Sequence, residues 1–373
     1  MENVDKMLFA EDDTASGHKT LPEALLPVGK WKVLIIDDEK DVHDVTILAL
    51  KRLEFESRGL EFLSAYSAAE GREILRTNPD IAVTLLDVVM EDDNAGLTLV
   101  RQIRDEMQND KVRIILRTGH PGQAPEESVT LEYDINDYRE KTELTARSLR
   151  TVLITALRSF RAISTIKSLN QEIDATQREL IYALGEIAES RSVETGHHVR
   201  RVGEISAILA SKCDLPQSEV TLLRLAASMH DLGKLAIDDS ILNKPGALTA
   251  EEFGIMKTHS QLGYEILCRS KRPLLKMAAI VAKEHHENYD GTGYPQGLRG
   301  EEINLHSRIV ALVDVLDALG TKRVYKDPWA RDRILDYIRA EKGKKFDPQI
   351  VDLFFQCRHE ISQIQERYVD PLR

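Results

Sequence analysis

Histidines gather in the second half of this chain. Of its 11 histidines, seven lie between residues 197 and 306. The pair His285-His286 precedes Asp290-Gly291-Thr292-Gly293-Tyr294-Pro295, a turn whose glycines tolerate positive φ. Neutral imidazole is a common metal ligand, and a glycine turn lets a substrate approach it closely. The alternative is a solvated histidine pair ahead of a surface loop.

Further residues of the ligand type surround that pair in the sequence. The run His230–Lys234 closes an apolar helical segment, and His198 has Glu194 four residues before it, on the same helix face. Asp314 lies in an apolar stretch, where a buried carboxylate is costly without a cation. Such a mixed set suits two or three borderline ions, iron or manganese, rather than thiolate-bound zinc. The candidate ligands are Glu194, His198, His230, Asp231, His259, His285, His286 and Asp314.

The elements that position these residues are all helical by pattern. Thr249-Ala250-Glu251-Glu252 has the form of a capping box that opens the helix carrying His259. A second helix, over Leu274–His285, delivers the histidine pair. Lys234 follows His230-Asp231 and is a candidate to contact a phosphate or protonate a leaving oxygen. The alternative for Lys234 is a cation that favours a helix C-terminus.

The first half of the chain has a different pattern, with short apolar runs between helical segments. Near-continuous apolar strands separated by helices predict a parallel sheet covered on both faces. We expect a doubly wound α/β domain of strand order 2-1-3-4-5, which binds ligands at the carboxyl ends of its strands. The expected strands are Val33–Ile36, Phe62–Ala65, Val83–Leu86, Ile114–Leu116 and Ile135–Tyr138.

Three carboxylates follow strands of that sheet. Asp37-Asp38 ends the first strand and Asp87 ends the third, which together predict a Mg²⁺ site. Thr118 after the fourth strand and Lys141 after the fifth would hold a phosphoryl group beside it. The alternative is a nucleotide-binding fold, but no Gly-x-Gly-x-x-Gly follows the first strand.

Residues 143–191 contain no proline and repeat apolar residues in a 3-4 alternation, the signature of a coiled coil. The step from Ile163 through Ile166 to Leu169 is a stammer. We expect a parallel dimer helix over residues 146–190; the alternative is a helix packed on its own domains. The expected seam is Leu149, Leu153, Ala156, Phe160, Ile163, Ile166, Leu169, Ile173, Thr176, Leu180, Ala183 and Ile187.

The second half resembles a known family through several motifs. His198, His230-Asp231 and Asp314 match the pattern of the HD metal-dependent phosphohydrolases, and Asp290–Pro295 resembles the HD-GYP subfamily of cyclic-dinucleotide phosphodiesterases. The resemblance covers residues 180–365. It implies that Asp231 and Lys234 are catalytic, that Glu194 completes a third metal position, and that Arg323 and Lys326 bind substrate phosphates. Gly320 and Val324 depart from the family's Thr and Pro in the substrate-side loop.

Residues 31–145 resemble the receiver domain of two-component response regulators. By this resemblance Asp87 is the phosphoacceptor, Asp37 and Asp38 help to hold Mg²⁺, and Thr118 and Lys141 contact the phosphoryl oxygens. Tyr138 matches the aromatic switch position. Thr142 stands where the family has proline after the lysine.

Composition places the chain among globular proteins, with 42% hydrophobic and 30% charged residues. The net charge of −12 argues against DNA binding. Three scattered cysteines, no long apolar run and no signal-peptide pattern predict a cytoplasmic protein without membrane spans. The expected division is an acidic tail (1–30), a receiver (31–145), a connecting helix (146–190) and an HD-GYP domain (191–373).

These patterns predict a response regulator that hydrolyses cyclic di-GMP to pGpG, with GMP as a further product, under control of Asp87. Its expected partners are a sensor histidine kinase, a second copy of the chain and a diguanylate cyclase. One rival is a cGAMP-preferring phosphodiesterase. Another is a phosphorylation-dependent interaction module with a structural metal site.

Overall fold

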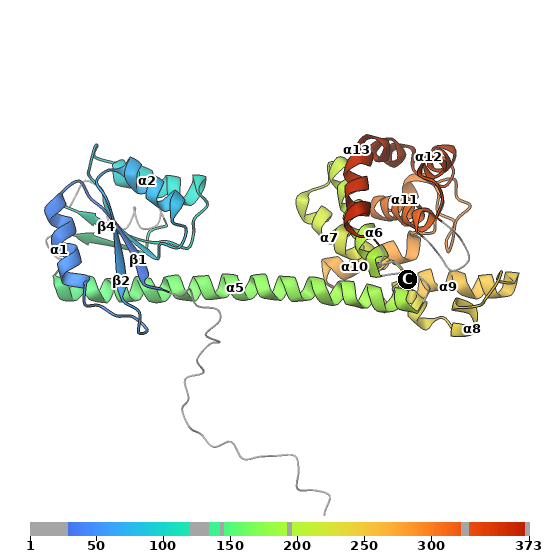
Figure 1. The fold of residues 1–373 in the computed structure, drawn as a ribbon, viewed down its shortest axis with the longest axis horizontal. Coiled ribbons are helices and arrows are strands. Elements are labelled where there is room, and N and C mark those ends of the chain that lie inside the picture. The colour runs from blue at the N-terminus through green and yellow to red at the C-terminus, as the bar shows by residue number, and fades with distance from the viewer. Residues whose placement is uncertain (1–28, 120–133, 142–144, 192–195, 322–327, 370–373) are drawn as a thin grey trace, which may run out of the picture. The chain divides into compact units, whose positions relative to one another are not determined.

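A computed structural model describes residues 29–119, 134–141, 145–191, 196–321 and 328–369 (Figure 1). The chain divides into two compact units, with the division after Glu172. The first unit contains a five-stranded parallel sheet of order β2-β1-β3-β4-β5, which confirms the predicted doubly wound topology. Its strands are β1 (Trp31–Ile36), β2 (Leu60–Ala65), β3 (Val83–Asp87), β4 (Arg113–Thr118) and β5 (Asp137–Glu140).

Alternate side chains of each inner strand enter two separate cores. Leu34 and Ile36 of β1 face one apolar cluster, and Val33 and Ile35 face the other. This explains the near-continuous apolar strands, because both faces of the sheet are buried. The covering helices of this unit are α1 (Lys40–Leu50), α2 (Ala68–Thr77) and α3 (Ala95–Arg101), with a π-helical extension over Gln102–Glu106.

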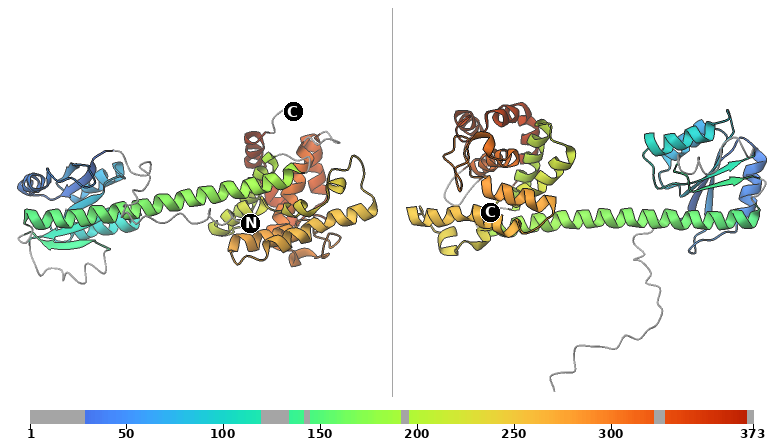
Figure 2. Two further views of the ribbon diagram at one scale, coloured as in Figure 1. Left: turned by 90° about the horizontal axis from the view of Figure 1, so that it is seen from below. Right: turned by 180° about the vertical axis from the view of Figure 1, so that it is seen from behind.

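Helix α5 (Ala146–Ser190) is a single helix of 45 residues (Figures 1 and 2). Its first turns complete the second core of the first unit, where the indole of Trp31 and the ring of Phe160 meet edge to face. The predicted seam residues Leu149, Leu153, Ala156 and Phe160 are therefore core residues of this unit. The reason is that a helix packed on a sheet and a helix in a coiled coil share the same apolar spacing.

The later part of α5 exposes apolar side chains instead. Ile166, Ile173, Leu180 and Ile187 are 57%, 51%, 59% and 53% exposed, and they recur every seven residues. Gly185 lies in the same part of the helix. A Cβ at Gly185 would lie 2.3 Å from the carbonyl oxygen of Ser228, so the glycine permits close helix contact.

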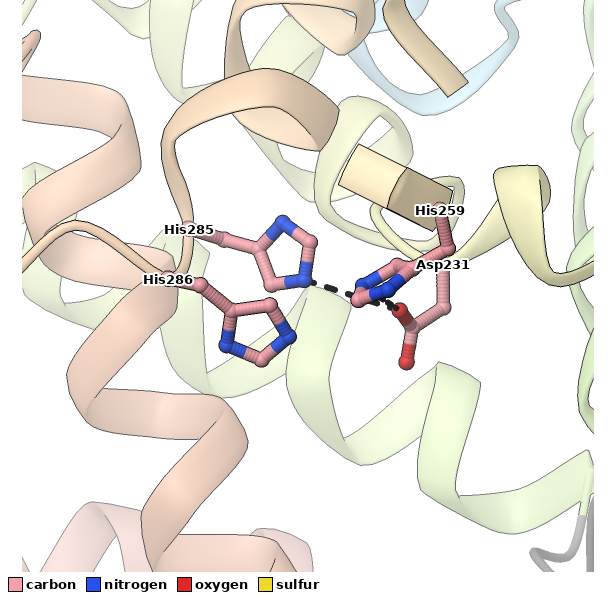
Figure 3. A group of neighbouring side chains, drawn as sticks. All are labelled: Asp231, His259, His285 and His286. Carbon is pink, nitrogen blue, oxygen red and sulfur yellow. Dashed lines mark ion pairs between the residues drawn. The ribbon is translucent and has the colours of Figure 1, made fainter. Parts of the chain in front are cut away.

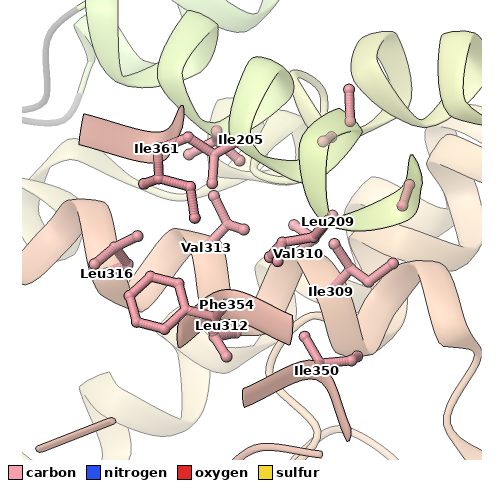
Figure 4. Close-up of a cluster of buried hydrophobic side chains, with 14 of the residues drawn as sticks. Ile205, Leu209, Ile309, Val310, Leu312, Val313, Leu316, Ile350, Phe354 and Ile361 are labelled. Atoms are coloured by element: carbon pink, nitrogen blue, oxygen red, sulfur yellow. The ribbon is translucent and has the colours of Figure 1, made fainter. Parts of the chain in front are cut away.

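The second unit is built from helices in the described residues. Its main core lies between α6, α7, α11, α12 and α13 (Figure 4), and a smaller core joins the end of α5 to α7, α9 and α10. The helices are α6 (Gly196–Lys212), α7 (Gln217–Ala227), α8 (Asp239–Leu242), α9 (Ala250–Leu267), α10 (Pro273–Glu284), α11 (Leu305–Gly320), α12 (Arg331–Ala340) and α13 (Pro348–Arg367), with 3-10 turns η3 (Leu232–Ala236) and η4 (Gly300–Glu302).

The predicted capping box is present at the start of α9, where Thr249 and Glu252 bond each other's backbone N–H. Among the described residues, no helix is both long enough and apolar enough to span a bilayer.

Replacing Leu157 with alanine should destabilise the receiver unit by roughly 2–5 kcal/mol, because the side chain is fully buried and would leave a cavity. Denaturant unfolding followed by the fluorescence of Trp31, which lies in the same core, measures this change. Trp329 is replaced by phenylalanine in every sample, so that Trp31 alone reports. Val45→Ala, which truncates a 67% exposed side chain on α1, is the control; equal midpoints for the two variants would contradict the assignment.

Candidate metal centre and phosphoacceptor site

The predicted histidine and aspartate ligands of the second unit converge on one cluster. Helix α7 ends at Ala227, and the turn that follows presents His230 and Asp231 before η3. A Cβ at Gly233 would lie 1.9 Å from the carbonyl oxygen of His259, so this glycine lets η3 lie directly against α9. His285 and His286 follow the last residue of α10. Figure 3 shows four of these side chains, Asp231, His259, His285 and His286, pointing toward one another.

The carboxylate of Asp231 lies at the centre of the cluster. Its Oδ1 atom is 3.1 Å from Nε2 of His259 and 3.5 Å from Nε2 of His285. Its Oδ2 atom is 3.2 Å from Nε2 of His230. One oxygen therefore faces the imidazoles of His259 and His285, and the other faces that of His230. Ligand atoms of Asp231, His259, His285 and His286 all lie within 4.8 Å of one another.

The imidazoles are held in the orientation of metal ligands. Nδ1 lies 2.8 Å from the carbonyl oxygen of Ala227 in His230, 2.7 Å from that of Met256 in His259, and 2.9 Å from that of Ala282 in His285. Within the described residues, the Nε2 atoms of these three histidines have no hydrogen-bond partner. A backbone carbonyl at Nδ1 fixes the tautomer that offers its Nε2 lone pair to a metal.

A second group of ligand atoms adjoins the first through His230. Glu189, His198 and His230 place one ligand atom each within 4.8 Å of the others. Asp314 Oδ1 lies 3.7 Å from Nε2 of both His198 and His230. His198 Nδ1 is 2.7 Å from Asp317 Oδ2, a carboxylate–histidine pair of the kind that orients a metal ligand.

The electrostatics of the cluster favour bound positive charge. Burial raises the pKa of Asp314, but the His230 and His198 rings outweigh it and hold that pKa below its usual value. Burial lowers the pKa of His230, but the carboxylates of Asp231 and Asp314 raise it well above the usual value. Burial and then the neighbouring imidazoles lower the pKa of His286. Anionic carboxylates beside lone-pair imidazoles fit divalent cations, so these residues match the metal group that the sequence predicts.

Lys234 lies inside the cluster rather than at a solvated helix end. Its Nζ atom is 2.6 Å from Asp231 Oδ2 and 3.2 Å from Glu189 Oε2. The side chain is only 13% exposed. An ammonium at this place can contact an anionic group that binds at the cluster.

The loop after the histidine pair is organised by Glu287. The carboxylate of Glu287 accepts hydrogen bonds from the backbone N–H groups of Gln296, Gly297 and Leu298 at 2.7, 3.2 and 3.1 Å. The ring of Tyr294 lies 4.8 Å from that of His286. The loop therefore places the aromatic ring of Tyr294 beside the candidate metal ligands.

Some of the predicted functional residues lie outside the described residues, and other residues of the site were not predicted from the sequence. Glu194, Arg323 and Lys326 lie outside the described residues, as do Thr142 and Val324. Sequence reasoning missed Glu189, Glu287, Asp317 and Arg201. Arg201 donates to Asp317 at 2.6 and 2.9 Å. Asp317 follows Asp314 by one helical turn, and this spacing was the available signal.

Three further histidines, His197, His306 and His359, have hydrogen-bond partners outside this cluster. Nδ1 of His197 is 2.8 Å from the carbonyl oxygen of Val369, and His306 is 3.3 Å from Glu219. His359 contacts Gln363 at 3.4 Å.

The receiver's acidic residues meet at the carboxyl ends of β1 and β3, as predicted. Lys141 Nζ lies 2.8 Å from Asp87 Oδ2 and 3.2 Å from Asp37 Oδ2, and it joins these two carboxylates. Burial raises the pKa of Asp87 despite the hydrogen bond from Lys141. Asp38 is exposed, and its oxygens group with those of Asp37 and Glu39.

The predicted switch residues of the receiver are buried. Thr118 ends β4 and its carbonyl accepts from the N–H of Lys141 at 2.7 Å, while Tyr138 lies in the first core. Arg117 was missed by sequence reasoning. Its guanidinium is buried, 3.2 Å from Asp37 Oδ2 and 3.0 Å from the hydroxyl of Thr46.

Comparison with known proteins agrees with this geometry. Residues 33–153 match the family of response regulator receiver domains, and residues 183–350 match a family of HD domains. The fold and site therefore define a receiver joined to an HD-type domain. The 3'3'-cGAMP-specific phosphodiesterase 2 of Vibrio cholerae is 33% identical over 91% of this chain and 94% of its own length.

The cyclic di-GMP phosphodiesterase response regulator RpfG of Xanthomonas campestris pv. campestris is 33% identical over 89% of each chain. The cyclic di-GMP phosphodiesterase of Thermotoga maritima is 30% identical over 91% of this chain and 93% of its own. The chain belongs to this family of response regulators with an HD-GYP domain.

Asp231→Asn should release most of the metal from both ligand groups. The reason is that one oxygen of this carboxylate faces His259 in the first group and the other faces His230 in the second. Metal per chain, measured by elemental analysis after dialysis, tests this. Asp352→Asn, which changes a 61% exposed carboxylate on α13, should keep the wild-type metal content. Full metal content in Asp231→Asn would contradict the assignment.

Proposed function

We propose that this protein is a response regulator whose HD-GYP domain hydrolyses cyclic di-GMP to pGpG, with GMP as a further product. The observation that carries the proposal is the carboxylate of Asp231, which lies between two sets of imidazoles whose Nε2 atoms face it. Ligands on both sides of one carboxylate are what a pair of neighbouring cations requires. Iron and manganese suit this mixture of nitrogen and oxygen ligands.

We assign the metal ligands to two groups. His259, His285 and His286 would hold one cation, His198, His230 and Asp314 would hold the other, and Asp231 would bridge them. Glu194 remains the candidate ligand of a third cation. Bound cations at such a site neutralise the charge of a phosphodiester and supply a nucleophile from water.

The chain's own side chains would do the remaining work. Lys234 reaches the cluster from η3, where its ammonium would contact the scissile phosphate or donate a proton to the leaving ribose oxygen. Arg323 and Lys326 are the candidates to bind the other phosphate of the ring. Tyr294, beside His286, offers a ring on which a guanine could stack.

A cGAMP-preferring enzyme is the second candidate function. A relative of comparable coverage is a 3'3'-cGAMP-specific phosphodiesterase, and the other two relatives act on cyclic di-GMP. Both substrates present the same phosphodiester to the metal ligands. Discrimination between guanine and adenine must therefore come from residues that contact the bases.

A product assay with cyclic di-GMP and 3'3'-cGAMP tests the proposal. Purification without oxygen keeps the metals in place, and chromatography of the products separates pGpG from GMP. Lys234→Met should keep its metal and fold but lose roughly 10²–10⁴-fold in kcat, the usual contribution of a positioned acid. Faster turnover of cGAMP would overturn the choice of substrate, and an unchanged rate in Lys234→Met would remove that lysine from the chemistry.

Control by phosphorylation would begin at the receiver. Asp87, 2.8 Å from Lys141 and close to Asp37, is the proposed phosphoacceptor for a sensor histidine kinase, with Mg²⁺ held by Asp37, Asp38 and Asp87. Thr118 and Tyr138 would respond to the phosphoryl group. Asp87 is buried and has little contact with water, so the charge state of its carboxylate depends strongly on the charged groups beside it.

The exposed apolar side chains of α5 support a parallel homodimer. Ile166, Ile173, Leu180 and Ile187 repeat with the seven-residue period of a two-stranded coiled coil. This seam is shorter than the sequence predicts, because the earlier apolar residues belong to the receiver core. The phosphoryl group can shift the equilibrium between two arrangements of the dimer only by the free energy with which it favours one of them.

The phosphoryl mimic beryllofluoride should raise turnover or change the dimer mass of the wild-type protein. Asp87→Asn should not respond, because the acceptor carboxylate is missing. Asp80→Asn, whose carboxylate is exposed and paired with Lys32, should respond like the wild type. Steady-state rates and light-scattering mass are measured together; identical values with and without the mimic, at confirmed occupancy of Asp87, would refute the coupling.

A further inference from the structure

A buried carboxylate lies at the end of the long helix. Glu189 is the next-to-last residue of α5 and is only 1% exposed. One turn earlier, Gly185 allows α5 to contact the carbonyl of Ser228, two residues before His230. The close contact at Gly185 brings the last turn of α5 to the metal cluster.

Glu189 touches the proposed catalytic lysine. The Nζ atom of Lys234 lies 3.2 Å from Oε2 and 3.4 Å from Oε1 of Glu189. A carboxylate buried to this degree is costly unless a cation or hydrogen-bond donors face it. Lys234, itself largely buried, supplies that charge.

Lys234 also contacts Asp231, at 2.6 Å. Asp231 is a proposed metal ligand, and its attraction for the ammonium would be weaker when its charge is shared with bound cations. Glu189 is then a buried carboxylate that still retains Lys234. Without it, the flexible four-carbon side chain would lose a fixed partner at the moment when the substrate needs it in place.

We propose that Glu189 is a positioning residue that holds the ammonium of Lys234 toward the scissile phosphodiester. This inference rests on the proposed function. It makes the last turn of α5 a part of the active site. Glu189 does not touch the substrate in this proposal and acts through Lys234 alone.

The competing role for Glu189 is that of a metal ligand. One of its oxygens lies within 4.8 Å of ligand atoms of His198 and His230. A ligand and a positioning residue predict different results when the charge is removed at constant size, because only the ligand controls metal content.

The test uses the full-length protein with Glu189→Gln, Glu189→Asp, Lys234→Met and the double variant Glu189→Gln/Lys234→Met. Glu189→Gln should keep the wild-type metal content and lose about tenfold or more in kcat, with little change in KM. Glu189→Asp should recover part of the rate. The double variant should be no slower than Lys234→Met, because the two residues act as one unit.

The matched control is Glu186→Gln, on the same helix, which removes a partly exposed carboxylate 3.3 Å from Arg200. It should behave like the wild type. A second readout needs no substrate: labelling of Lys234 by an amine reagent, measured by peptide mass spectrometry, should rise in Glu189→Gln and not in Glu186→Gln.

Loss of metal in Glu189→Gln would show a ligand and overturn the proposal. A double variant slowed by the product of the two single effects would also overturn it, as would unchanged labelling of Lys234. A wild-type protein that hydrolyses neither dinucleotide would refute the proposed function, while the labelling would still decide the role of Glu189.

Discussion

The second unit depends on one arrangement, the buried carboxylate of Asp231 among three imidazoles, those of His230, His259 and His285, whose Nε2 atoms face it. Burying Asp231 with lone-pair nitrogens on both sides is unfavourable unless positive charge lies between them. The ammonium of Lys234 and a proton on His230 supply part of that charge, and bound cations would in addition satisfy the Nε2 lone pairs of His259 and His285. The centre therefore has the character of a metal site before any substrate is considered.

The imidazoles around Asp231 are held mainly by backbone carbonyl groups and less by other side chains. Three histidines are fixed by carbonyl groups of their own helices, so their orientation follows from where each helix ends or turns. His198 is the exception, because Asp317 and Arg201 fix it through a buried ion pair. Glycines at 185 and 233 allow the backbones to approach closely enough for the ligands to meet.

The strand order, and the meeting of the described candidate ligands in one cluster, could be predicted because both have local signals in the sequence. Apolar strands alternate with helices, and the His-Asp and His-His pairs stand at helix ends. The Asp317–Arg201 pair and the burial of Glu189 could not be predicted, since each depends on contacts between distant segments. Arg117 was not predicted because it directly follows the apolar residues of its strand. The apolar repeat of α5 was ambiguous for a physical reason: packing on a sheet and packing on a second helix require the same spacing.

The continuity of α5 constrains how this protein can change in length during evolution. Each residue inserted into the helix rotates everything beyond it by about 100° and moves it by about 1.5 Å. An insertion of one residue between Phe160 and Ile166 would thus change the angle about the helix axis between the apolar residues packed in the first unit and the exposed apolar residues that follow. Seven residues add nearly two full turns and almost restore the angle. Related chains that share this architecture should therefore differ in linker length by heptads, while their globular halves diverge freely.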